Sequence, residues 1–305
     1  MNKWKKVGLT ALAASLVSTS AFAGEMSVAG KAKVNYTSGA GDVGGNPFSS
    51  SETLTFSGGG DLDNGMTVDV SYSLLDGAAT TASSVKLGMG DGGTLTFGVG
   101  ISGGVRSYDG KVPSAGEEVW DDIGSGDDAG VVDIGADPSL YYSVNAAGIN
   151  ASASYARTGT GTENSIALVA SELMDGAEFG IGTGTNVASA TSEDDYTTVY
   201  GKYTSGAFTI GVQLSEIDKT AAASDVDREA AAISFAVNEN LSISYGMSTV
   251  KYESSSKVDA ESTGVSASYT MGGMTIGAVA NKTDSFAGTS GTDKEFTEVS
   301  LSFAF

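Results

Sequence analysis

The last ten residues, Phe296 to Phe305, read F-T-E-V-S-L-S-F-A-F and decide the fold. From Val299 onward every second residue is large and apolar (Val299, Leu301, Phe303 and Phe305), and the residues between them are small. A period of two is typical of a β-strand with one apolar face and one thin, mostly polar face. Because the sequence stops on an aromatic residue, we interpret this stretch as a terminal strand that closes a barrel and places Phe305 at a lipid interface.

The composition excludes several kinds of chemistry. The 305 residues include no His and no Cys, so a Ser-His hydrolase, a Cys nucleophile, a structural zinc site and a disulfide framework all lack their defining residues. The formal net charge is −21 and is spread along the chain, which disfavours a nucleic-acid partner. We expect a protein that is not an enzyme, with carboxylate chemistry or a calcium site left open.

Residues 1–23 have the three parts of a secretory signal peptide: a region with three lysines, a mostly apolar stretch over 7–17, and the small-x-small pattern Ala21-Phe22-Ala23. The apolar stretch is well short of the ~20 residues that a membrane-spanning helix needs. We therefore expect cleavage after Ala23 and a mature chain of residues 24–305. Losing three lysines changes the formal charge from −21 to −24.

The mature sequence repeats the alternation of the terminal stretch. Over 26–37, Val28 and Val34 share one face while Lys31 and Lys33 share the other. A soluble sandwich would bury the first set in a core, and a membrane barrel would turn it toward lipid. About 16 such segments follow one another, each roughly long enough for a tilted strand to cross an outer membrane.

Short turns and longer loops alternate along the chain, which favours an up-and-down barrel over a Greek-key sandwich. The expected turns are centred near Asn64, Gly92, Ala147, Asp175, Gly206, Glu239 and Gly273. The expected loops cover 38–51, 75–83, 102–138, 158–164, 184–195, 216–228, 250–261 and 282–294.

In this pattern the sequence resembles Gram-negative general porins of the α-proteobacterial type. The resemblance rests on the signal peptide and first strand, the strand–Asp63-Asn64-Gly65–strand unit, the long third loop after the fifth strand, and the terminal Phe305. It covers residues 24–305. It implies an all-β transmembrane up-and-down antiparallel β-barrel of about 16 strands, a homotrimer, and a third loop folded into the lumen. The implied function is a water-filled channel in the outer membrane of a Gram-negative bacterium, for passive diffusion of ions and small hydrophilic solutes.

Under this interpretation the third loop, Ser102 to Asp137, narrows the pore. Loops of this length are uncommon unless they are functional, although the alternative is an acidic loop solvated outside the membrane. Trp120 is expected to pin the loop to the inner wall. The residues expected at the constriction are Arg106, Asp109, Glu117, Glu118, Asp121 and Asp122.

A basic wall is expected opposite these acids. Lys31, Lys33 and Lys86 lie on the thin faces of their strands, and long charged side chains avoid lipid by facing the lumen. Acids that face bases across a constriction would order water and favour polar solutes. The alternative is that the lysines only solvate the lumen wall. The acidic balance predicts a mild preference for cations.

Two further possibilities stay open. Oxygen ligands from Asp121, Asp122, Asp127 and Asp128 suit a structural Ca²⁺, although paired acids in such a loop also simply solubilise it; no other cofactor is expected. The alternative to a channel is a secreted acidic β-rich protein of the surface-layer or adhesin type, which would not contact outer-membrane lipid.

Overall fold

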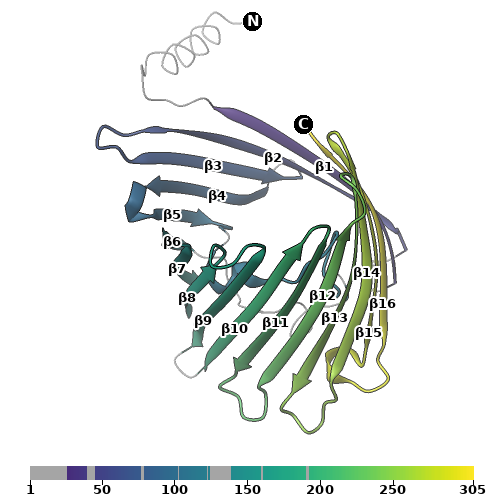
Figure 1. Cartoon of the computed structure of the whole chain (residues 1–305). Helices are drawn as coiled ribbons and strands as arrows, with labels where there is room; N and C mark the ends of the chain where they lie inside the picture. Colours follow the sequence, from purple (N-terminus) through teal and green to yellow (C-terminus); the bar gives the residue numbers. More distant parts are fainter. Residues whose placement is uncertain are drawn as a thin grey trace, which may run out of the picture.

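The computed structural model describes residues 26–39, 45–76, 79–101, 103–121, 123, 139–158, 161–189 and 192–305. The predicted signal peptide, residues 1–23, lies outside these residues. Sixteen antiparallel strands form one closed barrel, in which consecutive strands are paired and β1 pairs with β16 (Figure 1). The predicted barrel and its strand number are confirmed. No helix in the described part of the chain is long and apolar enough to cross a membrane.

The strands follow the sequence without crossovers, as an up-and-down barrel requires. Their bounds are β1 (Ser27–Gly39), β2 (Phe48–Asp61), β3 (Thr67–Leu75), β4 (Ala79–Gly88), β5 (Thr94–Val99), β6 (Leu140–Ala146), β7 (Ile149–Thr158), β8 (Gly161–Ala170), β9 (Ala177–Ser189), β10 (Ser192–Ser205), β11 (Phe208–Asp218), β12 (Val226–Ala236), β13 (Leu241–Tyr252), β14 (Ala260–Met271), β15 (Met274–Asp284) and β16 (Lys294–Ala304).

Alternation along the strands gives the barrel two different faces. In β8 the side chains of Ile166 and Leu168 are exposed, whereas Ser165 and Ala167 are buried. Successive side chains of a strand point to opposite faces, so every strand contributes to both. We call the side with large exposed hydrophobic residues the apolar face, and the other side the polar face.

The terminal strand closes the barrel as predicted. In β16, Val299 is opposite Tyr36 of β1, Leu301 is opposite Val34, and Phe303 is opposite Ala32. Phe305 extends this pairing past the end of β16, since its backbone exchanges two hydrogen bonds with Gly30 at 2.7 and 3.0 Å. Four alternate residues at the C-terminal end thus pair with β1, and this pairing between the first and last strands closes the barrel.

The predicted tight turns are confirmed at their positions. Between β2 and β3, Gly65 has φ of 81° and the side-chain oxygen of Asn64 accepts a hydrogen bond from Met66 N at 3.1 Å. Asn and Gly tolerate such a turn because Asn bonds its own backbone and Gly adopts positive φ at no steric cost.

Seven of the eight predicted loops are longer than the observed connections, most of all in three places. Loops expected over 75–83, 158–164 and 184–195 are only residues 76–78, 159–160 and 190–191. The strands continue through these stretches because backbone pairing needs no apolar side chain. Asp194 of β10, for example, is opposite Asn186 of β9. Hydrophobic alternation marks only the apolar band of a strand, so it misses the polar ends beyond that band.

Candidate functional site: the segment between strands five and six

The longest connection, residues 100–139, joins β5 to β6, as expected for the third loop. We call residues 101, 103–121 and 123 of this connection the β5–β6 segment. It begins with a short 3-10 helix, η2 (Gly104–Tyr108), and lies against the polar face. Its course is marked by hydrogen bonds from Val105 N to Ser165 Oγ of β8, from Ala115 N to Ser244 Oγ of β13, from Asn281 Nδ2 of β15 to Glu118 O, and from Lys294 Nζ of β16 to Ile123 O, at 2.9–3.3 Å.

Small residues on the polar face leave room for the segment. Gly211, Ala232, Gly246 and Gly264 are cross-strand neighbours on β11 to β14 and form one continuous row, which we call the glycine track. A Cβ atom added at Gly211 would lie 2.5 Å from Pro113 Cδ, and one at Gly246 would lie 2.8 Å from Val119 Cγ1. The segment therefore packs directly on strand backbone. The alternation rule assigns these glycines to the thin face, but it does not indicate what covers them.

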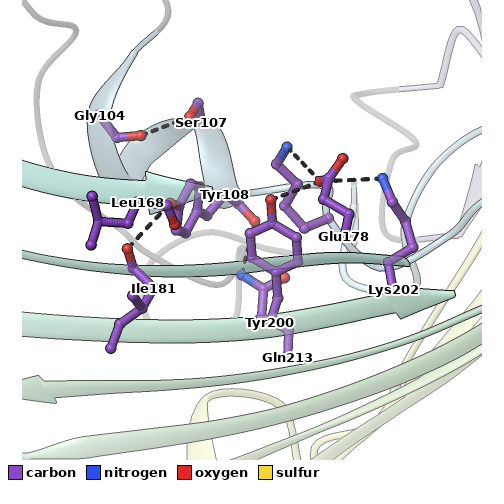
Figure 2. A network of polar contacts seen from close by, with 10 residues as sticks. Gly104, Ser107, Tyr108, Leu168, Glu178, Ile181, Tyr200, Lys202 and Gln213 are labelled. Atoms are coloured by element: carbon purple, nitrogen blue, oxygen red, sulfur yellow. Dashed lines mark hydrogen bonds and ion pairs between the residues drawn. The ribbon is translucent and has the colours of Figure 1, made fainter. Parts of the chain in front are cut away.

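Glu178 of β9 connects the segment to the wall (Figure 2). Its Oε1 accepts a hydrogen bond from Tyr200 Oη at 2.7 Å and forms ion pairs with Lys111 Nζ of the segment at 3.3 Å and Lys202 Nζ of β10 at 3.4 Å. The Lys111 ammonium also lies 5.2 Å from the centroid of the Tyr200 ring. Sequence analysis gave no signal for Glu178, because an isolated acid on a thin face has no spacing that sets it apart.

Tyr108 anchors the end of η2 beside this network (Figure 2). Its hydroxyl donates to the carbonyl oxygens of Leu168 at 2.9 Å and Ile181 at 3.3 Å, while its own carbonyl accepts a hydrogen bond from Gln213 Nε2 at 2.8 Å. The Tyr108 side chain is fully buried, and its ring meets that of Tyr200 edge-on with centroids 5.0 Å apart. Polar and aromatic contacts thus fix the same turn of the segment.

One predicted base and one predicted acid come together. Lys33 of β1 forms ion pairs with Glu298 of β16 at 2.8 Å and with Glu117 of the segment at 3.5 Å. The Glu298 side chain is only 3% exposed. Lys31 and Lys86 lie on the same polar face and are exposed, and neither forms an ion pair within the described part of the chain.

The other predicted constriction residues lie on the same segment. Arg106 is half-buried within η2 and Asp109, directly after it, is exposed. Asp121 Oδ2 accepts a hydrogen bond from Glu118 N at 2.8 Å. Burial, together with the nearby Asp121 and Asp109 carboxylates, raises the pKa of Glu118 to about 8. At neutral pH this carboxyl is therefore mainly protonated.

This pKa predicts that the segment packs less firmly at alkaline pH. Because the pKa of Glu118 is higher in the folded chain than its ordinary value of 4.5, the stabilisation is complete below about pH 4.5 and is lost as the pH rises through 8. We expect Glu118→Gln to unfold at the same temperature as the parent at pH 4.5 and at a higher temperature at pH 8.5. Thermal unfolding of both proteins at the two pH values measures this. An equal response of the two proteins to pH would contradict it.

The calcium prediction is not decided by these positions. Asp122, Asp127 and Asp128 lie outside the described residues. Among the residues that are described, no three acids gather in a way that would hold a metal ion.

Trp120 is buried against the polar face, as expected for a residue that pins the segment. It is 3% exposed and packs in one cluster with Val119 and with Ala230 of β12. The guanidinium of Arg228 lies 6.0 Å from the centroid of its ring, within the range of a cation–π contact. The indole N–H has no hydrogen-bond partner among the described residues, so packing and the contact with Arg228 hold the ring.

Comparisons with known proteins agree with this architecture. The family model described as Gram-negative porin matches residues 8–305, and no curated protein matches the chain. Similar solved structures include a porin refined at 1.8 Å resolution, with 18% identity, 92% of this chain and 100% of that chain covered, and a TM-score of 0.70. A loop L8 deletion mutant of OmpT, an outer membrane protein of Vibrio cholerae, has 14% identity, 92% and 99% coverage and a TM-score of 0.71. An anion-selective porin from Comamonas acidovorans has 16% identity, 92% and 99% coverage and a TM-score of 0.69.

Proposed function

Because the chain belongs to the Gram-negative porin family and is an outer-membrane channel rather than an enzyme, we propose that it passes ions and small hydrophilic solutes by passive diffusion. Its preference for cations is mild. The β5–β6 segment narrows the lumen. The observation that carries this proposal is the contact of the β5–β6 segment with polar-face side chains of β8, β13, β16 and β1. Strands that lie so far apart around a closed barrel contact the same segment most directly when that segment lies inside the barrel.

Charge placement supports a selectivity that is mild rather than strong. Within the described strands the polar face has six bases and six acids, so the excess negative charge lies elsewhere. The bases are Lys31, Lys33, Lys86, Lys202, Arg228 and Lys294, and the acids are Asp61, Asp69, Glu163, Glu178, Asp194 and Glu298. The described part of the segment adds two bases, Arg106 and Lys111, and three acids that are charged at neutral pH, Asp109, Glu117 and Asp121, because Glu118 is mainly protonated there. Cation preference then depends on the segment and not on the net charge of the chain.

A single-channel recording in a planar bilayer tests the function. In a KCl gradient we expect stepwise conductance and a reversal potential that favours K⁺. Asp109→Asn should shift this potential toward zero, because it removes an exposed charge of the segment. A reversal potential that favours Cl⁻ would contradict the cation preference, and the absence of any conductance would contradict the channel.

The apolar face is proposed to contact lipid. Val299 is 47% exposed on that face, and its neighbour Ser300 lies on the polar face. We expect Val299→Lys to destabilise the barrel by ~2–4 kcal/mol, the cost of a base at the lipid-facing midplane. Ser300→Lys should change stability by less than about 0.5 kcal/mol, as for an uncritical surface site. Urea unfolding in lipid vesicles measures both. Equal losses would place Val299 in a protein core instead.

The homotrimer is a further part of the proposal. β5 has six residues and β6 has seven, and only four residue pairs join them. A strand needs roughly 9–11 residues to cross the bilayer, so this side of the barrel is short of a full span and a second copy would shield it. Cross-linking in native membranes should capture three copies. Capture of monomers alone would contradict the assembly.

A further inference from the structure

A groove of about 340 Å³ lies on the polar face of β1 to β4. Its lining comes from these four strands, and no residue of the β5–β6 segment takes part. Its polar lining residues are Ser27, Ser57, Asp69, Ser71, Ser84 and Lys86, and Gly58, Gly59 and Val70 complete the lining. It lies toward the end of the barrel where the β2–β3 turn, residues 62–66, connects its strands.

Four of these side chains form a row of hydroxyl groups. Ser27, Ser57, Ser71 and Ser84 are directly opposite one another on consecutive strands. Neighbouring strands are about 4.8 Å apart, a spacing comparable to that between alternate hydroxyls on a six-membered sugar ring. Ser27 and Ser57 share a hydrogen bond of 2.8 Å, while the hydroxyls of Ser71 and Ser84 have no partner among the described residues.

The next row presents one acid and one base that do not pair. Asp69 of β3 is directly opposite Lys86 of β4, yet the two form no ion pair within the described part of the chain. Gly59 lies beside them, and a Cβ atom there would come within 2.6 Å of Asp69 Oδ1. The groove thus offers a carboxylate acceptor, an ammonium donor and two hydroxyls that can do either.

We propose that this groove is a binding subsite for a small, neutral, polyhydroxylated solute of monosaccharide size, an inference that rests on the proposed channel function. A sugar hydroxyl both donates and accepts, so adjacent hydroxyls satisfy Asp69, Lys86, Ser71 and Ser84 together. A simple ion would pair with either Asp69 or Lys86 and leave the other charge without a partner. The groove has no aromatic platform among its lining residues, so binding is weak. Weak binding suits conduction, because the solute must leave as readily as it enters.

Ion-current recordings with added glucose test the subsite. We expect glucose to reduce the single-channel current of the parent protein in a saturable way. Ser71→Ala with Ser84→Ala should raise the half-saturating glucose concentration by roughly tenfold, since two hydrogen bonds are lost. Ser73→Ala is the matched control, since Ser73 lies on the same strand outside the groove and its hydroxyl is held by Thr55 at 2.9 Å. This variant should respond to glucose like the parent.

The outcomes separate this inference from the proposed function. Normal conductance in salt without a saturable glucose effect would overturn the subsite and leave the channel intact. A saturable effect of glycine, a zwitterion, together with none of glucose would also overturn it, because Asp69 and Lys86 would then select charge. No conductance in salt alone would overturn the channel, and the subsite with it.

Discussion

Lys33→Met is expected to destabilise the folded barrel by ~3–5 kcal/mol, the cost of leaving a buried charge without its partner. Glu298 is 3% exposed and 2.8 Å from the Lys33 ammonium, so its carboxylate would stay buried without a counter-charge. The same substitution also removes the ion pair to Glu117 of the β5–β6 segment. Urea unfolding in detergent micelles measures the free energy of unfolding.

Two further variants make this result specific. Lys31→Met, two residues earlier on the same face and without an ion pair among the described residues, should change stability by less than about 0.5 kcal/mol. Adding Glu298→Gln to Lys33→Met should restore most of the loss, since the unpaired charge is then gone. Equal effects of the two lysine variants would show that general charge, and not this pair, determines stability.

Trp120→Ala is expected to remove ~3–5 kcal/mol of the packing that holds the β5–β6 segment, as for other large aromatic residues in cores. The segment should leave the wall while the strands stay paired. Hydrogen exchange would then increase at residues 103–121 and stay slow in β8 to β13. Under the proposed function, in which the segment narrows the lumen, single-channel currents would also become noisier.

Trp120→Phe is the matched control for this prediction. The indole N–H has no hydrogen-bond partner in the part of the chain that the structure describes, so phenylalanine loses only part of the ring contact and should keep the segment in place. If the phenylalanine variant were as disturbed as the alanine variant, the N–H would have a partner in solution. If neither variant altered exchange, the contacts of Glu178 and Tyr108 would be sufficient to hold the segment.

The faces of the strands could be predicted because they depend on local spacing. A period of two assigned Val299, Leu301 and Phe303 to the apolar face, and it assigned Lys31 and Lys33 to the polar face. The same rule misplaced three loops, because a polar strand end has no hydrophobic alternation to mark it. β8 begins at residue 161 and β9 ends at residue 189, and at both positions the backbone pairing continues where the hydrophobic alternation has ended.

The sequence predicted which segment forms the candidate site, but not which strand residues that segment contacts. The long connection after the fifth strand and its acids were predicted from the sequence, and the contact of Lys33 with Glu117 follows the expected opposition of charges. Glu178 and the glycine track were missed. Their importance comes from Lys111 and Pro113, which are 67 and 98 positions away along the chain. A local sequence pattern cannot indicate a contact between residues so far apart along the chain.

The sequence by itself determined the strand period, the turn positions and the absence of histidine and cysteine chemistry, since each depends on neighbouring residues or on composition alone. Only the tertiary structure decided which side chains meet across the barrel. Closure brings Lys33 beside Glu298, and the segment beside Gly211 and Gly246. These contacts depend on the register of sixteen strands at once, because a shift of one residue in any pair would turn every side chain of that strand to the other face.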